Sequence, residues 1–129
     1  MPQFKLETKD GIILSFAEVT GPVGSRFVKM LLDTGATYTI IPHEVAIAIG
    51  CDPSASRKRV EFITASGSEY APMVTIESIK CFGFEIKNFD VVCHNLPPKS
   101  SVDGLLGLNF LTHFNVNLKF PLRTLEITP

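Results

Sequence analysis

Residues 31–42 read Leu-Leu-Asp-Thr-Gly-Ala-Thr-Tyr-Thr-Ile-Ile-Pro and place one acidic residue, Asp33, at the end of an apolar strand. A carboxylate in such surroundings is costly to ionise unless it is hydrogen-bonded or paired. Thr34 offers a hydroxyl that can brace the turn, and Gly35 lets the backbone turn sharply or approach a ligand. This arrangement suits general acid–base chemistry on a water molecule. Activating water and protonating a leaving amine calls for two carboxyls that share one proton, and this stretch contains one.

The residues on either side of this stretch predict a mostly β domain with one or two short helices. Apolar residues alternate with polar ones or form short runs, separated by Gly, Pro, Asn and Asp. Asp10-Gly11 predicts a hairpin turn, and Pro42 and Gly50 bound the first predicted helix. The expected strands cover residues 27–32, 60–64, 70–76, 79–81 and 84–92 with a closing hairpin over 116–127, and the expected helices cover 43–49 and 108–114.

The size and composition of the chain fit one globular domain over residues 1–129. The hydrophobic fraction is 45%, the charged fraction 19% and the net charge −1, so no strong field favours nucleic acid or anionic lipid. No apolar run approaches the roughly 20 residues that a membrane helix needs. The three cysteines, at positions 51, 81 and 93, form no C-x-x-C pair. They are interpreted as free thiols, which favours a cytoplasmic location.

Several other motifs are incomplete. His43-Glu44 begins like a zinc-binding H-E-x-x-H helix, but Ile47 stands where the second histidine is needed. The serines around Gly67 do not form a G-x-S-x-G nucleophile elbow. The basic cluster at residues 57–59 is interpreted as a solvated loop, and Asp103 as a loop-capping residue rather than a second catalytic acid. We therefore expect no metal, no cofactor and no nucleic-acid partner.

Three segments, taken in order, resemble the clan AA aspartic proteases, which include the retroviral and cellular retropepsins. Residues 31–36 resemble the catalytic loop of that family. Residues 102–111, Val-Asp-Gly-Leu-Leu-Gly-Leu-Asn-Phe-Leu, resemble its second signature, in which two apolar residues and a glycine precede a helix. Residues 63–67, Ile-Thr-Ala-Ser-Gly, lie between them, where the family carries its flap. The resemblance covers essentially the whole chain and implies a retropepsin-like acid protease barrel, built as the single-domain subunit of a homodimer.

The resemblance also implies residue roles. Asp33 of each subunit would form a catalytic pair, Thr34 would hydrogen-bond across the two-fold axis, and Gly35 would contact the substrate backbone. Water held between the two Asp33 carboxyls would hydrolyse a peptide bond, without metal or covalent intermediate. Residues 105–107 would pack beneath the catalytic loop. The flap would close over the peptide, whose expected binding residues are Ala36, Ile40, Ile63, Ser66, Gly67 and Leu106.

Two departures from the viral pattern occur together. Viral enzymes usually carry Asp at the position of Thr37 and Arg at the position of Leu108, and these side chains pair near the subunit contact. Because both are replaced here, no orphan charge is left buried. This favours a cellular or bacterial branch of the family. Two alternatives stay open at this point: a dimeric interaction module that has the fold but no proteolysis, and a β-barrel with an unknown ligand.

Overall fold

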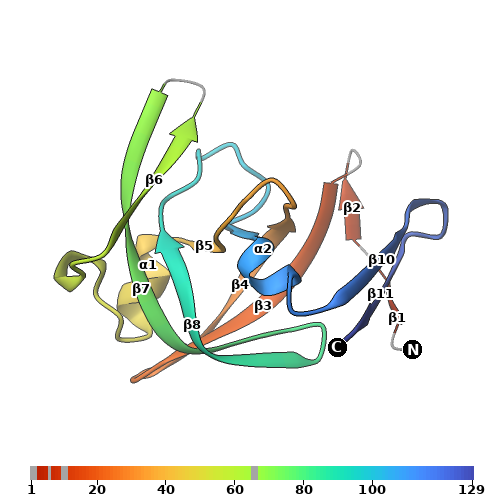
Figure 1. Cartoon of the computed structure of the whole chain (residues 1–129), viewed down its shortest axis with the longest axis horizontal. Helices are drawn as coiled ribbons and strands as arrows, with labels where there is room; N and C mark the ends of the chain where they lie inside the picture. Colours follow the sequence, from red (N-terminus) through yellow and green to blue (C-terminus); the bar gives the residue numbers. More distant parts are fainter. Residues whose placement is uncertain (1–2, 6, 10–11, 65–66) are drawn as a thin grey trace.

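A closed β-barrel forms most of the chain in the computed structural model, which describes residues 3–5, 7–9, 12–64 and 67–129 (Figure 1). The structure confirms the predicted mostly β class with two short α-helices. The strands are β1 (Gln3–Lys5), β2 (Glu7–Lys9), β3 (Ile12–Gly21), β4 (Gly24–Leu32), β5 (Ile40–Ile41), β6 (Arg59–Thr64), β7 (Gly67–Cys81), β8 (Phe84–Cys93), β9 (Gly104–Leu106), β10 (Asn115–Lys119) and β11 (Thr124–Thr128). The helices are α1 (His43–Ala48) and α2 (Leu108–Leu111), with 3-10 turns η1 (Pro53–Ala55) and η2 (Phe120–Leu122).

The barrel closes through one additional strand pairing. The larger sheet has the order β2-β3-β4-β9-β5-β8-β7-β6, and β3 also pairs with β7. The six strands β3, β4, β9, β5, β8 and β7 therefore form a closed ring. Strand β6 pairs with β7 and extends beyond this ring. A separate sheet has the order β1-β11-β10, so the segments near the two ends of the chain lie side by side (Figure 1).

The strand β7 differs from its prediction. The sequence predicted separate strands over 70–76 and 79–81, whereas one 15-residue strand runs from Gly67 to Cys81. Its first part pairs with β6 and its remainder with β8, and both faces change environment along its length. A strand that passes from an exposed hairpin into a barrel wall cannot keep one alternation pattern, which is why the prediction divided it.

The predicted helices and hairpins are largely confirmed. Helix α1 begins directly after Pro42 and ends one residue before the predicted end, with Gly50 following at a φ of 90°. Helix α2 begins at the predicted residue but ends at Leu111 rather than Phe114. The predicted pairings β2–β3 and β10–β11 are present, while the Asp10-Gly11 turn itself lies outside the described residues. No helix within the described ranges is long and apolar enough to span a membrane.

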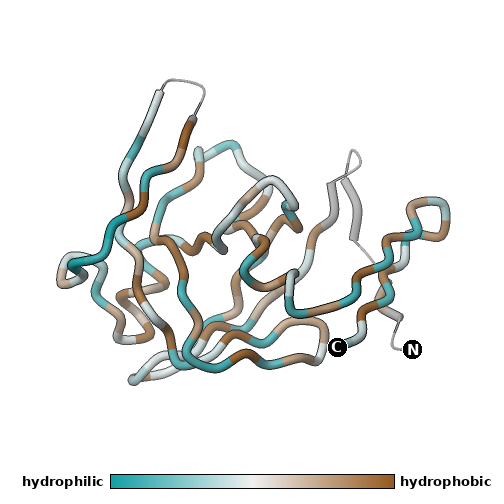
Figure 2. Tube along the Cα trace, viewed as in Figure 1, coloured by the Kyte–Doolittle hydropathy of each residue, from teal (hydrophilic) through white to brown (hydrophobic). Residues whose placement is uncertain are grey.

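The barrel interior holds the main hydrophobic core. Along β4, the buried residues Val28, Met30 and Leu32 alternate with more exposed neighbours, so that one face of this strand packs inward. Hydrophobic residues recur along the other barrel strands as well (Figure 2). Phe110 of α2 is fully buried and packs edge-to-face on Phe89, with 6.3 Å between ring centroids. All three cysteines are free, as predicted. Burial raises the pKa of the Cys81 thiol to about 11 and that of Cys93 to about 12, so both stay protonated at neutral pH.

Candidate active site

Asp33 lies in a loop, residues 33–39, that connects β4 to β5. Its backbone N–H donates a hydrogen bond to the carbonyl of Leu106 at 3.0 Å, which fixes the end of β4. The Gly35 N–H donates to Asp33 Oδ1 at 2.8 Å, and the Ala36 N–H donates to the Asp33 carbonyl at 3.2 Å. The backbone of the loop therefore holds the half-buried Asp33 side chain in place.

A second loop, residues 104–108, comprises β9 and the start of α2 and packs against the first loop. Strand β9 runs parallel to β4, with Leu105 beside Leu31 and Leu106 beside Leu32. Beyond it, the Leu108 N–H donates to the carbonyl of Ala36 at 2.8 Å. The prediction that residues 105–107 pack beneath the catalytic loop is confirmed.

Gly107 is the closest point between the two loops. A Cβ atom at this position would lie 2.7 Å from the carbonyl carbon and oxygen of Tyr38 and 2.8 Å from the carbonyl oxygen of Ala36. All three atoms belong to the backbone and cannot turn aside. The catalytic loop therefore rests directly on a position where only glycine fits.

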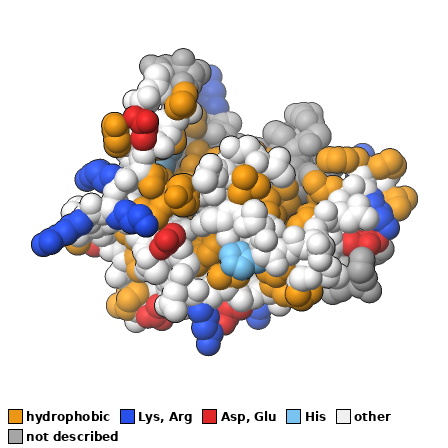
Figure 3. Space-filling view, in the orientation of Figure 1, with side chains coloured by type: hydrophobic (Ala, Val, Ile, Leu, Met, Phe, Trp, Pro, Cys, Tyr) orange, Lys and Arg blue, Asp and Glu red, His pale blue; other side chains and the backbone are white. Residues whose placement is uncertain are grey.

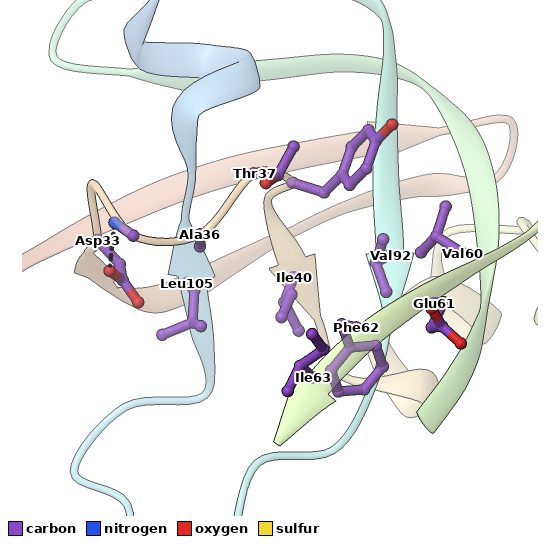
Figure 4. A pocket seen from close by; sticks show the side chains of 12 residues that line it. Asp33, Ala36, Thr37, Ile40, Val60, Glu61, Phe62, Ile63, Val92 and Leu105 are labelled. Carbon is purple, nitrogen blue, oxygen red and sulfur yellow. Dashed lines mark hydrogen bonds between the residues drawn. The ribbon is translucent and has the colours of Figure 1, made fainter. Parts of the chain in front are cut away.

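A cavity of about 680 Å³ opens beside Asp33, between the catalytic loop and the hairpin formed by β6 and β7 (Figure 4). Its wall is mostly apolar, and hydrophobic side chains are visible at the base of that hairpin (Figure 3). Of the described residues that line it, two are acidic and none is basic. The lining consists of Asp33, Gly35, Ala36, Thr37, Tyr38, Ile40, Val60, Glu61, Phe62, Ile63, Val92 and Leu105.

The structure brings together Asp33, Gly35, Ala36, Ile40 and Ile63, which the sequence placed at the site. These residues come from the loop, from β5 and from β6, which are separated along the chain and joined through the sheet. The other seven lining residues were not predicted at the site: Thr37, Tyr38, Val60, Glu61, Phe62, Val92 and Leu105. Most of them are apolar, and apolar character gives no signal because it is equally typical of core residues.

One predicted binding residue has to be corrected. Leu106 has an exposed fraction of 0% and packs in the barrel core, whereas its neighbour Leu105 lines the cavity. Successive side chains of a strand point to opposite faces, so one position along β9 decides between core and cavity. Leu106 therefore supports the loop through its carbonyl and its packing and does not face a ligand.

Two other predicted site residues, Thr34 and Gly67, do not line the cavity. Thr34 is exposed and borders a different depression. Gly67 begins β7 as an exposed residue with a φ of 125°, paired with Thr64. Ser66 lies outside the described residues.

The β6–β7 hairpin projects from the barrel (Figure 1). Residues 60–63 of its first strand line the cavity. Val60 and Phe62 point from the hairpin onto a small apolar cluster formed by Ala71, Met73 and Val92. The Phe62 ring also packs edge-to-face against His94, with 4.9 Å between ring centroids. Ile63, nearer the tip, is 84% exposed. The base of the hairpin is thus anchored by packing while its end presents an apolar side chain beside the cavity.

The depression beside Thr34 is smaller, at about 370 Å³, and lies at the junction of the catalytic loop, α2 and β10. Its described lining carries no charged side chain. Leu108, one of the two positions at which the sequence departs from the viral pattern, contributes to its wall. The lining residues are Leu32, Thr34, Leu108, Leu111, Thr112, Phe114, Val116 and Leu118.

Within the described residues, no group of three or more His, Cys, Asp or Glu side chains is arranged to hold a metal ion.

A family model for the gag-polyprotein putative aspartyl protease matches residues 19–113, a range that includes both loops and the β6–β7 hairpin. The chain belongs to this family of retropepsin-like aspartic proteases. A Sinorhizobium protein, described as an uncharacterized protein in the cobV 5′ region, is 31% identical over 96 residues, which are 74% of this chain. The match spans 40% of that relative's length.

The fold has a counterpart among solved structures. The crystal structure of a retropepsin-like aspartic protease from Rickettsia conorii is similar, with a TM-score of 0.72 and 23% sequence identity. The similarity covers 95% of this chain and 87% of the Rickettsia chain. The predicted retropepsin-like fold is confirmed.

Proposed function

We propose that this retropepsin-like protein is an aspartic endopeptidase whose active site forms between two copies of the chain. The observation that carries the proposal is Asp33, which borders a mostly apolar cavity and accepts a hydrogen bond from the Gly35 N–H. The sequence contains one Asp-Thr-Gly, and acid–base hydrolysis of a peptide needs two carboxyls that share a proton. A symmetric pair of chains provides the second carboxyl.

The reaction then follows from the two carboxyls. One ionised Asp33 accepts a proton from a water molecule, and the water oxygen attacks the carbonyl carbon of the peptide bond. The other Asp33, which is protonated, donates its proton to the carbonyl oxygen, so that a tetrahedral gem-diol forms. The first Asp33 then gives the proton it took from water to the amide nitrogen, while the second accepts a proton from a hydroxyl of the gem-diol. The C–N bond breaks to give a carboxylic acid and an amine, and one proton remains on the pair. No bond between enzyme and substrate forms at any step.

The substrate is a peptide or protein segment in an extended conformation. Gly35 has no side chain to obstruct a backbone that runs past Asp33. Ala36, Ile40, Ile63 and Leu105 offer apolar surface for substrate side chains. The β6–β7 hairpin acts as the flap, and the exposed Ile63 side chain contacts the bound peptide.

The uncharged depression beside Thr34 supports the pairing of two chains. If two Asp33 carboxyls share a proton, the partner must cover Thr34, which is the next residue, and the surface that adjoins it. This surface is apolar, as expected for the centre of a homodimer contact. Leu108 replaces the usual viral Arg within it, so hydrophobic burial takes the place of the ion pair.

We predict that a charge in this depression weakens the dimer. Leu118→Lys should raise the dimer dissociation constant at least about tenfold, because a charged group would have to be desolvated in the contact. Thr112→Lys tests the same contact from an exposed position, so it does not depend on core packing. Sedimentation of each variant, beside Ile47→Lys on α1 as the control, gives the dissociation constants. Unchanged dimers in both depression variants would place the contact elsewhere.

Cleavage of a mixed peptide library by the purified chain, from acidic to neutral pH, tests the function itself. The proposal expects cleavage whose rate per chain falls when the protein is diluted below its dimer dissociation constant. A stable dimer that cleaves no peptide would reject proteolysis and indicate an interaction module with this fold.

A further inference from the structure

Thr39 is a buried polar residue at the end of the catalytic loop, with an exposed fraction of 0%. We propose that Thr39 and Asn109 are positioning residues that hold this loop in its reactive geometry, an inference that rests on the proposed proteolytic function. A threonine between Tyr38 and Ile40, and an asparagine in the apolar run of α2, have no obvious place in a core. Their hydrogen bonds explain why both are there.

Every hydrogen-bonding group of Thr39 has a partner. Its backbone N–H and its Oγ1 both donate to Asn109 Oδ1, each at 2.9 Å. Oγ1 also accepts a hydrogen bond from the Gly107 N–H at 3.1 Å, and its carbonyl accepts one from the Val92 N–H at 2.9 Å. One side chain thus ties the catalytic loop to the second loop, while its backbone is tied to β8.

Asn109 completes the connection. Its Nδ2 donates to the carbonyl of Asp90 on β8 at 2.7 Å, and its backbone N–H donates to the carbonyl of Thr37 at 3.2 Å. One side chain at position 109 has to accept hydrogen bonds from the Thr39 N–H and Oγ1 and also donate one to the Asp90 carbonyl. An amide meets this requirement, whereas a carboxylate lacks the donor and an apolar side chain lacks both.

The hydrogen bonds of Thr39 and Asn109 fix the part of the loop that follows Asp33, residues 36–39. The start of the loop is held by the hydrogen bond from the Asp33 N–H to the Leu106 carbonyl. Its middle is held by the hydrogen bond from the Leu108 N–H to the Ala36 carbonyl. The far end depends on Thr39 and Asn109. Loss of the hydrogen bonds at this end would leave the barrel closed and Asp33 in the chain, but would let residues 36–39 shift. In a pair of chains that shift would change how the two carboxyls face each other.

The central test is Thr39→Val, which preserves shape and removes the hydroxyl. We expect kcat to fall by about 10- to 100-fold, since small displacements of reacting groups have effects of that size, while KM changes little. The pH–rate profile should also shift, because the interaction of the two carboxyls depends on their separation. Thr39→Ser, which restores the hydroxyl, should recover most of kcat, and Asn109→Asp, which lacks the donor to Asp90, should behave like Thr39→Val.

Thr75→Val is the matched control, because Thr75 donates to the Asp90 carboxylate at an exposed site outside the catalytic loop. It should leave kcat and the pH–rate profile unchanged. If Thr39→Val lowers only the melting temperature and keeps the native kcat and profile, the residue is structural and the inference is wrong.

A readout that does not require cleavage separates this inference from the proposed function. The NMR resonances of the Gly35 amide and the Asp33 carboxyl report the loop conformation whether or not the protein cleaves peptides. Thr39→Val should shift or broaden both, and Thr75→Val neither. A native protein without activity would reject the proposed function, whereas unchanged resonances in Thr39→Val would reject the inference.

Discussion

Asp33→Asn is expected to abolish peptide cleavage while the protein stays folded and dimeric. An asparagine has nearly the shape of aspartate but cannot accept the proton of the attacking water or pass it to the leaving amine. The loss should be at least about 100-fold in kcat, the lower range for removal of a general acid–base group. The Gly35 N–H can still donate to the amide oxygen, so the loop should keep its conformation. Initial rates with the best library peptide measure the effect.

Asp103→Asn is the matched control for this variant. Asp103 is an exposed acid that precedes β9, and its backbone N–H donates to the Lys29 carbonyl at 2.8 Å. Its side chain does not line the cavity, so its replacement should leave the rate within about twofold of native, as surface substitutions usually do. Activity that survives in Asp33→Asn, or disappears equally in Asp103→Asn, would contradict the assignment of Asp33.

Gly107→Ala should have the second largest effect, on both stability and activity. Its added methyl group would lie 2.7 Å from backbone atoms of Tyr38 and 2.8 Å from the Ala36 carbonyl oxygen. One loop has to move away from the other, and overpacking of this kind typically lowers the free energy of unfolding by about 1–3 kcal/mol. The displaced loop carries Asp33, so kcat should fall together with the denaturant midpoint.

Gly83→Asn provides the comparison for Gly107→Ala. Gly83 lies in the turn between β7 and β8, where an added Cβ would have no neighbour within 4 Å. Its φ of 80° is a conformation that asparagine accepts better than most residues. This variant should lose little stability and no activity. A Gly107→Ala protein with native stability and kcat would show that the two loops do not depend on their close contact.

The sequence predicted the local parts of the fold, and the structure places the predicted site residue Asp33 beside the cavity. Pro42 and Gly50 set the ends of α1 almost to the residue, because both act through their own backbone geometry. Asp33 was singled out by the residues around Asp-Thr-Gly, because the three residues alone are common and usually form a turn. The resemblance of residues 31–36 and 102–111 to known proteases added the barrel, and the structure places these two segments side by side.

Other features depend on contacts between distant segments and could not be predicted locally. Alternation along β9 places Leu105 and Leu106 on opposite faces but does not say which face is the core. Only closure of the barrel decides that, and it buries Leu106. Thr39 and Asn109 are 70 residues apart, and neither signals the other in the sequence. The long strand β7 is likewise continuous because it pairs with β6 along its first part and with β8 along the rest.

The central claim, that one active site uses Asp33 from two chains, is tested most directly by mixing native and Asp33→Asn subunits. The mixtures are prepared at a concentration where all chains are dimeric, and subunits are allowed to exchange. If mixed dimers are inactive, an equal amount of Asp33→Asn should reduce the activity of a fixed amount of native chain to about half, and a threefold excess to about a quarter, because random pairing in a two-fold dimer removes native partners. Activity that stays constant at every ratio would show that each chain works alone and would contradict the account.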